Sequence, residues 1–325
     1  MTPFYHPTSI LVLDDDPLFL ESLDFQFSDE LSCQTFTRPD AALEHLRAQA
    51  SQHPDFSRYF KDCSELDMGP DRRLGDRLLR LQLSELRSIF DDEARHQRVS
   101  VAVVDYDMPK MTGVEFCRAI AGLPVKRILL TGKAGLETAI SAFNEGVIDC
   151  FLQKQDANVS AALRREIKRL QNQYFEEISN PIRCALDLQQ PCFFFDPNFI
   201  DLFEDTVEKY DIVEHYICAW PPGVMMRDAE GREYFLLISN HDSAQSHCEV
   251  AESQAAPSEM VEMLRSREAH AWFPTHEGYY HPDYEMDWAR YIWPAQLLPG
   301  SGTWTYSFIR HEDAIPDQRA QRKSA

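Results

Sequence analysis

The sequence predicts an α/β fold: a doubly wound, parallel, five-stranded sheet in the first half of the chain, followed by an α+β unit. Two observations support this prediction. Short apolar runs, such as residues 9–13 and 101–104, end at turn-forming residues, as do strands that are buried on both faces. Segments with helical spacing separate these runs, so that strand and helix alternate five times along the chain.

The first half divides into five strands and the helices between them. The expected strands are residues 9–13, 31–37, 101–104, 126–130 and 147–152. The expected helices are residues 17–28, 39–48, 114–121 and 135–145. Asp16 and Pro17 mark the start of the first helix, because aspartate is a preferred N-cap residue and proline a preferred first helical residue.

Residues 50–98 interrupt this alternation as an insertion that a compact strand–helix–strand unit does not need. Residues 51–70 are polar and rich in turn formers, whereas residues 71–97 have the spacing of a helix with a wide apolar stripe. Such a stripe must be buried against something. Two interpretations remain open: a lengthened helix that packs on its own domain, or an added surface for a partner or a second protomer.

Polar side chains follow four of the five strands, at the edge where open α/β sheets bind ligands. Asp14 and Asp15 follow the first strand, Asp105 the third, Thr131 the fourth and Lys154 the fifth. Converging carboxylates would bind a hard divalent cation such as Mg²⁺ through oxygen. A hydroxyl and an ammonium beside them suit a tetrahedral anion. The set therefore predicts a place where a carboxylate nucleophile receives a phosphoryl group.

Four ordered motifs resemble the receiver domain of bacterial two-component response regulators, which has a flavodoxin-like fold. They are residues 10–17 (ILVLDDDP), 103–113 (VVDYDMPKMTG), 129–132 (LLTG) and 151–154 (FLQK). The resemblance covers residues 1–157 apart from the insertion. It implies a phosphoprotein that accepts a phosphoryl group from a sensor histidine kinase in a phosphorelay.

The resemblance also implies roles for the acidic residues. Asp105 would be the phosphoacceptor. Asp15 and Asp105 would bind Mg²⁺ together with the backbone carbonyl of Asp107, and Asp14 would act mainly through water. The receiver would thus catalyse only its own phosphorylation and dephosphorylation.

A switch at the phosphoacceptor is implied by three further residues. Lys154 and Thr131 would contact the phosphoryl group, and Phe151 stands where the family keeps an aromatic residue that swings inward when the threonine moves. The chain departs from the family at two neighbouring positions. Gln155 replaces the usual proline after the lysine, so we expect that loop to differ in shape, and Gly132 replaces the commoner alanine, which should leave access to the phosphoryl group more open.

Two residues are candidates for tuning the lifetime of the phosphoryl group. Asp107 and Lys133 each stand two residues beyond a site residue, the phosphoacceptor and the threonine respectively. There they would orient or obstruct the attacking water, so we expect the pair to set the rate of dephosphorylation.

A second, more specific resemblance comes from residues 142–149 (AFNEGVID) together with the insertion. Both are similar to response regulators of the Legionella quorum-sensing type. This resemblance implies a role in quorum sensing.

Residues 158–180 are expected to extend the last receiver helix into a connector that ends at Asn180-Pro181. Apolar residues repeat along this helix at intervals close to those of a coiled-coil seam. They are Val159, Leu163, Ile167, Leu170, Tyr174 and Ile178. From Leu170 onward the receiver has no sheet left to cover, so we expect this half to pair protomers in a homodimer. The alternative is a receiver helix with one face on the sheet.

Residues 181–325 are expected to form an α+β output domain of a type that the sequence does not identify. They hold 24 acidic and 11 basic residues, a balance that argues against DNA binding. One interpretation is a module that binds a protein or a small ligand under the control of Asp105. Another is an unrecognised enzyme, for example a nucleotide-related one, that uses groups such as His281, Asp283 and Glu285. A third is a receiver that only titrates phosphoryl groups, with this half as a scaffold.

The composition limits these alternatives. The chain has 325 residues, enough for two domains, and a formal net charge of −21, the wrong sign for binding nucleic acid. No run of 18 apolar residues is present and residues 1–7 lack the features of a signal peptide, so we expect a cytoplasmic protein. The eight cysteines form no CxxC pair, which predicts reduced thiols.

Overall fold

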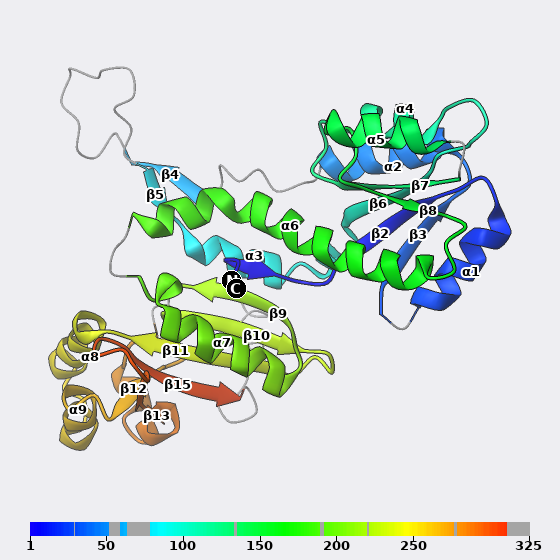
Figure 1. Ribbon diagram of the computed structural model, residues 1–325. Coiled ribbons are helices and arrows are strands. Elements are labelled where there is room, and N and C mark those ends of the chain that lie inside the picture. The colour runs from blue at the N-terminus through cyan, green and yellow to red at the C-terminus, as the bar shows by residue number, and fades with distance from the viewer. Residues whose placement is uncertain are drawn as a thin grey trace, which may run out of the picture.

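A computed structural model of the protein describes residues 1–28, 30–51, 59–63, 79–132, 135–188, 192–219, 221–275 and 278–310. The chain forms two large β-sheets with helices packed on them, and one long helix runs past both sheets (Figure 1). Among the described helices, none is long and apolar enough to cross a membrane.

The first sheet is parallel throughout and has the strand order β3-β2-β6-β7-β8. Its strands are β2 (Ser9–Leu13), β3 (Ser32–Phe36), β6 (Val99–Asp105), β7 (Lys126–Thr131) and β8 (Cys150–Gln153). Every residue of β2 and β6 is buried, as expected for strands covered on both faces. The predicted five-stranded, doubly wound sheet is confirmed.

Helices cover both faces of the first sheet. They are α1 (Pro17–Phe27), α2 (Pro39–Ser51), α4 (Gly113–Ala119), α5 (Leu136–Asn144) and α6 (Val159–Asp187). Figure 1 shows α2, α4 and α5 on one face, with α1 and the first part of α6 on the other. Leu46 and Phe116 are buried in the first of these layers, and Leu23 and Ile167 in the second. Asp16 caps α1, as predicted, by accepting a hydrogen bond from the Leu18 amide.

The second sheet is antiparallel and has the order β1-β9-β10-β11-β15-β14. Its strands are β1 (Phe4–Tyr5), β9 (Ile212–Cys218), β10 (Gly223–Asp228), β11 (Glu233–Ser239), β14 (Gln296–Leu297) and β15 (Thr305–Arg310). The remaining elements of this half are α7 (Pro197–Tyr210), α8 (His241–Ser253), α9 (Ser258–Arg265), β12 (Ala269–Ala271) and β13 (Ile292–Pro294). The expected α+β character of this half is confirmed.

The N-terminal strand lies in the second sheet, although the chain then enters the first. Phe4 of β1 is paired with Tyr216 of β9, and β2 of the first sheet begins at Ser9. The two sheets are therefore linked at the very start of the chain as well as through α6.

The prediction of a single helix over residues 71–97 is wrong. Residues 71–78 lie outside the described part of the chain. The remainder forms β5 (Leu79–Leu81), which pairs with β4 (Phe60–Asp62), followed by α3 (Leu86–Phe90) between two short 3-10 helices. The regular helix ends after α3 because Asp92 starts a new turn, accepting a hydrogen bond from the Ala94 amide.

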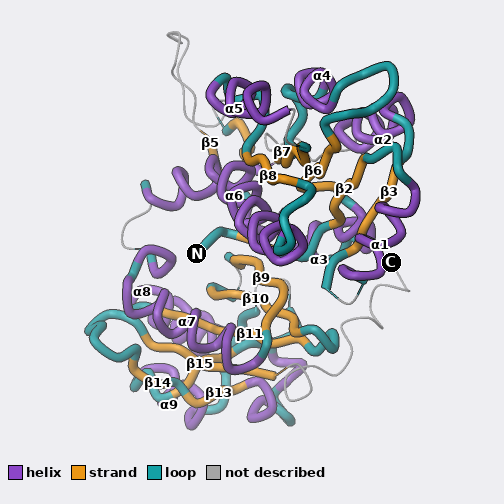
Figure 2. Tube along the Cα trace, turned by 45° about the vertical axis from the view of Figure 1, so that its right-hand side comes forward, coloured by secondary structure: helices purple, strands orange, loops and turns teal. Residues whose placement is uncertain are grey.

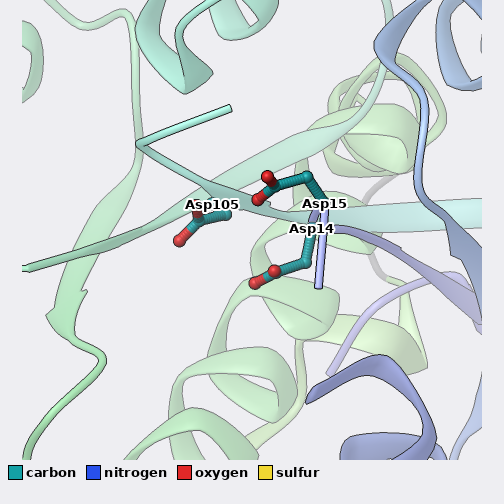
Figure 3. Close-up of side chains that lie close together, drawn as sticks. All are labelled: Asp14, Asp15 and Asp105. Atoms are coloured by element: carbon teal, nitrogen blue, oxygen red, sulfur yellow. The ribbon is translucent and has the colours of Figure 1, made fainter. Parts of the chain in front are cut away.

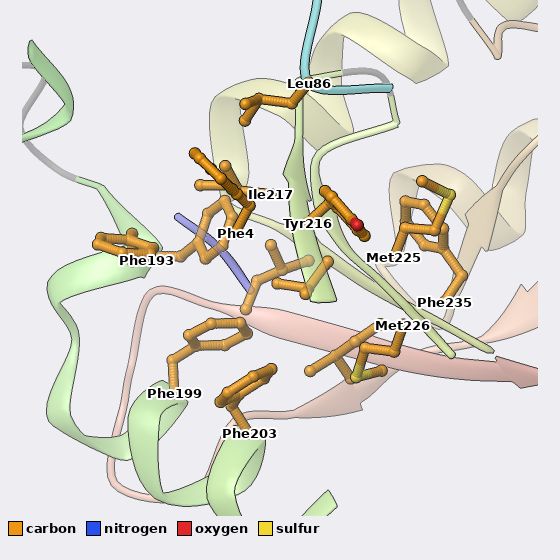
Figure 4. Packing of buried hydrophobic residues seen from close by; sticks show 14 of the residues in the cluster. Phe4, Leu86, Phe193, Phe199, Phe203, Tyr216, Ile217, Met225, Met226 and Phe235 are labelled. Atoms are coloured by element: carbon orange, nitrogen blue, oxygen red, sulfur yellow. The ribbon is translucent and has the colours of Figure 1, made fainter. Parts of the chain in front are cut away.

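The apolar stripe of this segment covers the second sheet, a location that neither interpretation of the sequence anticipated. Leu86 and Phe90 are buried in the same core as Tyr216 of β9, and Figure 4 shows Leu86 and Tyr216 within it. The Phe90 and Tyr216 rings meet edge to face, with 5.4 Å between their centroids. The inserted segment thus joins the first sheet to the second half of the same chain.

The predicted end of the connector at Asn180-Pro181 is also wrong, because α6 continues through Pro181 to Asp187. A proline inside a helix removes a hydrogen bond and costs about 3 kcal/mol. Beyond it, the side chains of Ile182 and Leu186 are only 0% and 2% exposed in the second core. Their burial contributes about 1.5–3 kcal/mol each, which offsets the cost of the proline.

The apolar stripe along α6 is shared between the two sheets, past which α6 runs in Figure 2. Leu163, Ile167 and Leu170 lie in the core of the first sheet, whereas Tyr174 lies in the core of the second and Ile178 packs against it. The expectation that this half of the helix had no sheet to cover is wrong, since it covers the second sheet. A homodimer remains a prediction. The apolar stripe of α6 no longer supports it, because that stripe packs within one chain.

Candidate active site

The acidic residues meet where β2 and β6 end. These strands are parallel neighbours, with Leu13 beside Val104, so the residues that follow lie at the same edge of the sheet. Oxygen atoms of the Asp14, Asp15 and Asp105 carboxylates all lie within 4.8 Å of one another (Figure 3). Asp14 and Asp105 are buried, at 0% and 6% exposure, whereas Asp15 is exposed to solvent.

Lys154 comes from the end of β8 and contacts two of these carboxylates. Its Nζ lies 2.5 Å from Asp14 Oδ2 and 3.2 Å from Asp105 Oδ1. The backbone amide of Lys154 donates to the Thr131 carbonyl at 3.0 Å, which fixes the end of β8 against that of β7. The aromatic ring of Phe19 borders the site, and its centroid lies 4.3 Å from the same Nζ.

Burial and nearby charges have opposite effects on the pKa of Asp14 and on that of Lys154. Burial raises the pKa of Asp14 above its ordinary value, and the hydrogen bonds from Lys154 and from the Asp16 amide reverse this only in part. Burial alone would lower the pKa of Lys154. Its hydrogen bond to Asp14 and the charge of Asp105 outweigh that effect and hold the pKa of Lys154 above its ordinary value. The ammonium therefore stays charged and offsets part of the negative charge of the three carboxylates.

Thr131 is the last residue of β7 and is completely buried. Its hydroxyl donates to the Gly132 carbonyl at 3.0 Å. A Cβ added to Gly132 would meet no heavy atom within 4 Å, so the backbone here does not require glycine for space.

Asp107 and Phe151 border the site. The amide of Asp107 donates to Asp105 Oδ2 at 3.1 Å, while the Asp107 side chain is exposed. Phe151 is half-buried beside α5, with its ring edge to face against that of Phe143 at 6.2 Å between centroids. Lys133, the other residue expected to tune dephosphorylation, lies outside the described residues.

Two glycines that the sequence analysis gave no role prove to shape the site. A Cβ on Gly113 would lie 2.2 Å from the carbonyl oxygen of Asp105, and one on Gly135 would lie 2.3 Å from Thr131 Oγ1. Both positions therefore require close approach of the backbone to a site residue. Gly113 belongs to the predicted motif 103–113, but only the folded chain reveals which atoms approach it.

The donor set fits a hard divalent cation. Three carboxylates supply oxygen ligands at one point of the surface, and one of them, Asp15, faces solvent. Asp14, Asp15 and Asp105 could hold Mg²⁺ together with the backbone carbonyl of Asp107. The loop after Lys154 carries Gln155 where the family usually has proline. In this loop the Asp156 carboxylate accepts a hydrogen bond from the Asn158 amide at 2.8 Å.

The groups considered for an output enzyme do not form an enclosed site. His281, Asp283 and Glu285 are all exposed. Nδ1 of His281 lies 3.1 Å from Asp283 Oδ2 in a surface pair. None of the three lines the pocket found in this half of the molecule.

Comparisons with known proteins agree with this geometry. The response regulator receiver domain family matches residues 84–163. Among solved structures, the chain is similar to the Legionella pneumophila response regulator LqsR, with 25% identity and a TM-score of 0.70 over 99% of this chain and 92% of that chain. No match was found among curated proteins.

Two further structures match about half of the chain. An adenylate cyclase from Rhodopirellula baltica is 21% identical, with a TM-score of 0.35 over 55% of this chain and 97% of that chain. The signal receiver domain of an HD domain-containing protein from Pseudomonas fluorescens Pf-5 is 17% identical, with a TM-score of 0.35 over 53% of this chain and 92% of that chain. From its parallel sheet, its family match and its full-length likeness to LqsR, the chain contains a CheY-like receiver domain of the response regulator family.

Proposed function

We propose that the protein is a two-component response regulator that accepts a phosphoryl group on Asp105 from a sensor histidine kinase. One observation carries the proposal. The Asp105 carboxylate lies at the carboxyl edge of the sheet, beside the carboxylates of Asp14 and Asp15 and the ammonium of Lys154. The positive charge of Lys154 reduces the repulsion between the Asp105 carboxylate and an anionic phosphoryl group.

In this proposal each residue of the edge has one task. Asp105 attacks phosphorus as the bond between phosphorus and the kinase histidine breaks, and Lys154 stabilises the negative charge that develops on the transferred group. Asp15, Asp105 and the Asp107 carbonyl would hold Mg²⁺, and Asp14 would act through water. When bound, Mg²⁺ neutralises oxygens of the phosphoryl group.

The switch is proposed to use Thr131 and Phe151. In the present conformation, the Thr131 hydroxyl is engaged with the Gly132 carbonyl. A phosphoryl oxygen on Asp105 would be a stronger, charged acceptor for that hydroxyl. When Thr131 turns towards it, the space beside Phe151 changes, and Phe151 moves inward from its contact with Phe143.

The output is proposed to act by binding a protein or a small ligand in the cytoplasm rather than DNA. The acidic composition of residues 181–325 supports this choice, because a DNA-binding surface needs positive charge. The similarity of residues 142–149 to Legionella quorum-sensing regulators supports a role in quorum sensing.

Phosphorylation would also promote a homodimer. Light scattering of the full chain with and without a phosphoryl donor can detect this change in molar mass.

Phosphorylation is tested directly by intact-mass measurement of the full chain after incubation with acetyl phosphate and Mg²⁺. The proposal predicts one added phosphoryl group, lost in Asp105→Asn and reduced by a chelator or by Asp15→Asn. Asp24→Asn, which changes an exposed aspartate of α1, is the matched control and should leave the reaction unchanged. An equal mass shift in Asp105→Asn would refute Asp105 as the acceptor.

The tuning role of Asp107 and Lys133 has a separate test. Asp107→Ala and Lys133→Ala should each change the half-life of the phosphoryl group, because both positions stand two residues beyond a site residue. Unchanged half-lives in both variants would count against this role while leaving the acceptor assignment intact.

A further inference from the structure

A pocket in the second half of the molecule brings together a serine and a histidine from separate strands. Ser239 ends β11 and His270 is the middle residue of β12, and both line the pocket. Ser239 Oγ lies 2.9 Å from His270 Nε2. This is the distance at which a histidine takes a proton from a serine nucleophile.

The hydrogen bonds of His270 determine which ring nitrogen is free to act as a base. The hydroxyl of Ser307 donates to the Pro294 carbonyl at 2.8 Å, so towards Nδ1 of His270, 2.9 Å away, it can only accept. Nδ1 therefore carries the proton and Nε2 has the lone pair. Ser307 orients the ring in the way that the third member of a catalytic triad does.

Besides Ser239, Thr305 is a neighbour of His270 Nε2. Its Oγ1 lies 3.0 Å from His270 Nε2 and 3.4 Å from the carbonyl oxygen of Ser239, to which it donates. With the threonine proton on that carbonyl, Ser239 Oγ has two acceptors within reach, His270 Nε2 at 2.9 Å and Thr305 Oγ1 at 3.1 Å, and Nε2 is the closer of the two.

We propose that Ser239 and His270 form an acyl-transfer site that hydrolyses small, neutral, activated acyl esters or thioesters. The pocket favours a neutral acyl group, because its walls include Pro222, Leu237, Leu264 and Ala271 and no Asp, Glu, Lys or Arg side chain. The cavity is small, about 30 Å³, so only a short acyl group suits it, with the rest of the ester in its open mouth.

The reaction balances with water as the only co-reactant. Ser239 Oγ forms a bond to the acyl carbon while its proton moves to His270 Nε2. The bond to the alcohol or thiol breaks, and that group leaves with the proton. Water then attacks the acyl carbon and gives a proton to Nε2. The bond between the acyl carbon and Ser239 Oγ breaks, Ser239 takes up the proton from Nε2, and the carboxylic acid leaves. Helix α8 begins at His241, two residues after Ser239, so the positive end of its dipole is near the nucleophile in sequence.

The basicity of His270 sets the kind of leaving group. Burial lowers the pKa of His270 to about 4, helped by the nearby charges of His247 and Arg267. A base this weak gives limited help to a poor leaving group. Aryl esters and thioesters, whose leaving groups need little protonation, are therefore the expected class.

The test uses the full chain and p-nitrophenyl acetate. We expect release of p-nitrophenol with formation of an acetyl adduct on Ser239, found by peptide mass spectrometry. Ser239→Ala should abolish the adduct, and His270→Gln should slow acylation by about 100-fold. Ser246→Ala, which changes an exposed serine of α8, is the matched control and should react as the unmodified chain does.

Three outcomes would overturn the proposal. They are an unchanged rate in Ser239→Ala, acetylation that avoids Ser239, and failure of a fluorophosphonate to label Ser239 in the folded, unmodified chain. The last of these does not depend on whether any variant folds. As a positioning residue, Ser307 has its own readout: Ser307→Ala should move the low-pH midpoint of the acylation rate, which a purely structural role would leave in place.

Discussion

Arg95 and Glu214 form a buried ion pair that joins the inserted segment to the second sheet. Nε of Arg95 lies 3.1 Å from Glu214 Oε2, and Nη2 lies 2.8 Å from the same oxygen. The two side chains are only 3% and 4% exposed. Tyr216 completes the site by donating its hydroxyl to Glu214 at 3.2 Å. The contact between the two halves is therefore specific, and it lies between segments far apart in the sequence.

Removing one member of this pair should destabilise the protein strongly. Arg95→Met leaves the Glu214 carboxylate buried without its main partner, so the free energy of unfolding should fall by about 3 kcal/mol in urea titrations. The double variant Arg95→Met/Glu214→Leu should recover much of that loss, since no charge is then left buried. Arg118→Met, at an exposed ion pair with Glu145, is the control and should have little effect. Equal losses in the single and double variants would contradict the account.

The same region should make the protein sensitive to acid. Burial lowers the pKa of His6 to about 3, with Glu214, His96 and Arg95 as its charged neighbours. Below the ordinary histidine pKa of 6.5 the unfolded chain takes up the proton first, so stability is full above that pH and is lost as the pH falls towards 3. The slope is about 1.4 kcal/mol per pH unit for one such group. Urea titrations of His6→Phe should show a smaller slope between pH 6 and 4, and an identical slope would contradict this assignment.

Glu214 should add to this acid sensitivity over a lower range. Burial raises the pKa of its carboxyl, but the hydrogen bonds from His96 and Arg95 outweigh burial and lower the pKa to about 2. A depressed carboxyl pKa stabilises the folded state above the ordinary value of 4.5, and this contribution is lost as the pH falls towards 2. Glu214→Gln should therefore flatten the pH dependence below 4.5, measured relative to its own stability at neutral pH.

Gly135 should tolerate a methyl group poorly because of what lies beside it. In Gly135→Ala the new Cβ would lie 2.3 Å from Thr131 Oγ1 and 2.9 Å from the Tyr106 ring. We expect a loss of about 1–3 kcal/mol of stability together with slower phosphorylation, since Thr131 must shift. Gly132→Ala is the matched control, because its Cβ would meet nothing within 4 Å. Equal stability of the two variants would show that the site has more room than the structure indicates.

The ammonium of Lys154 should compete with Mg²⁺ for the acidic cluster. Lys154→Met removes a positive charge 2.5 Å from Asp14 and 3.2 Å from Asp105, so Mg²⁺ should bind more tightly to this variant. Asp15→Asn should weaken binding by about tenfold, equivalent to about 1.4 kcal/mol. Calorimetric titration measures both. Tighter binding to Asp15→Asn than to the unmodified chain would contradict the metal assignment.

The parallel sheet and its acidic edge could be predicted because both follow from local patterns. Short apolar runs such as Ile10–Leu13 that end at turn formers favour strands buried on both faces, and their ends bring Asp14 and Asp105 together once the sheet is parallel. The path of the inserted segment could not be predicted this way. Its leucines indicate burial, but not which surface covers them, and that surface is β9, more than a hundred residues later.

Pro181 illustrates the same limit. Local propensity ends a helix at proline, whereas burial of Ile182 in a distant core keeps the helix intact. The pairing of β1 with β9 has the same cause, since two residues, Phe4 and Tyr5, carry too little pattern to identify a partner strand. The Ser239–His270 contact also arises only from the pairing of strands that are distant in sequence.

Phosphorylation of Asp105 is proposed to change the state of the whole chain, whose two sheets are joined by α6 and the inserted segment. The most direct measurement compares the thermal unfolding temperature and the molar mass in solution of the full chain, with and without Mg²⁺ and beryllofluoride. The account predicts a shift in at least one of these quantities for the unmodified chain and in neither for Asp105→Asn. Unchanged values in the unmodified chain, or the same shift in Asp105→Asn, would contradict it.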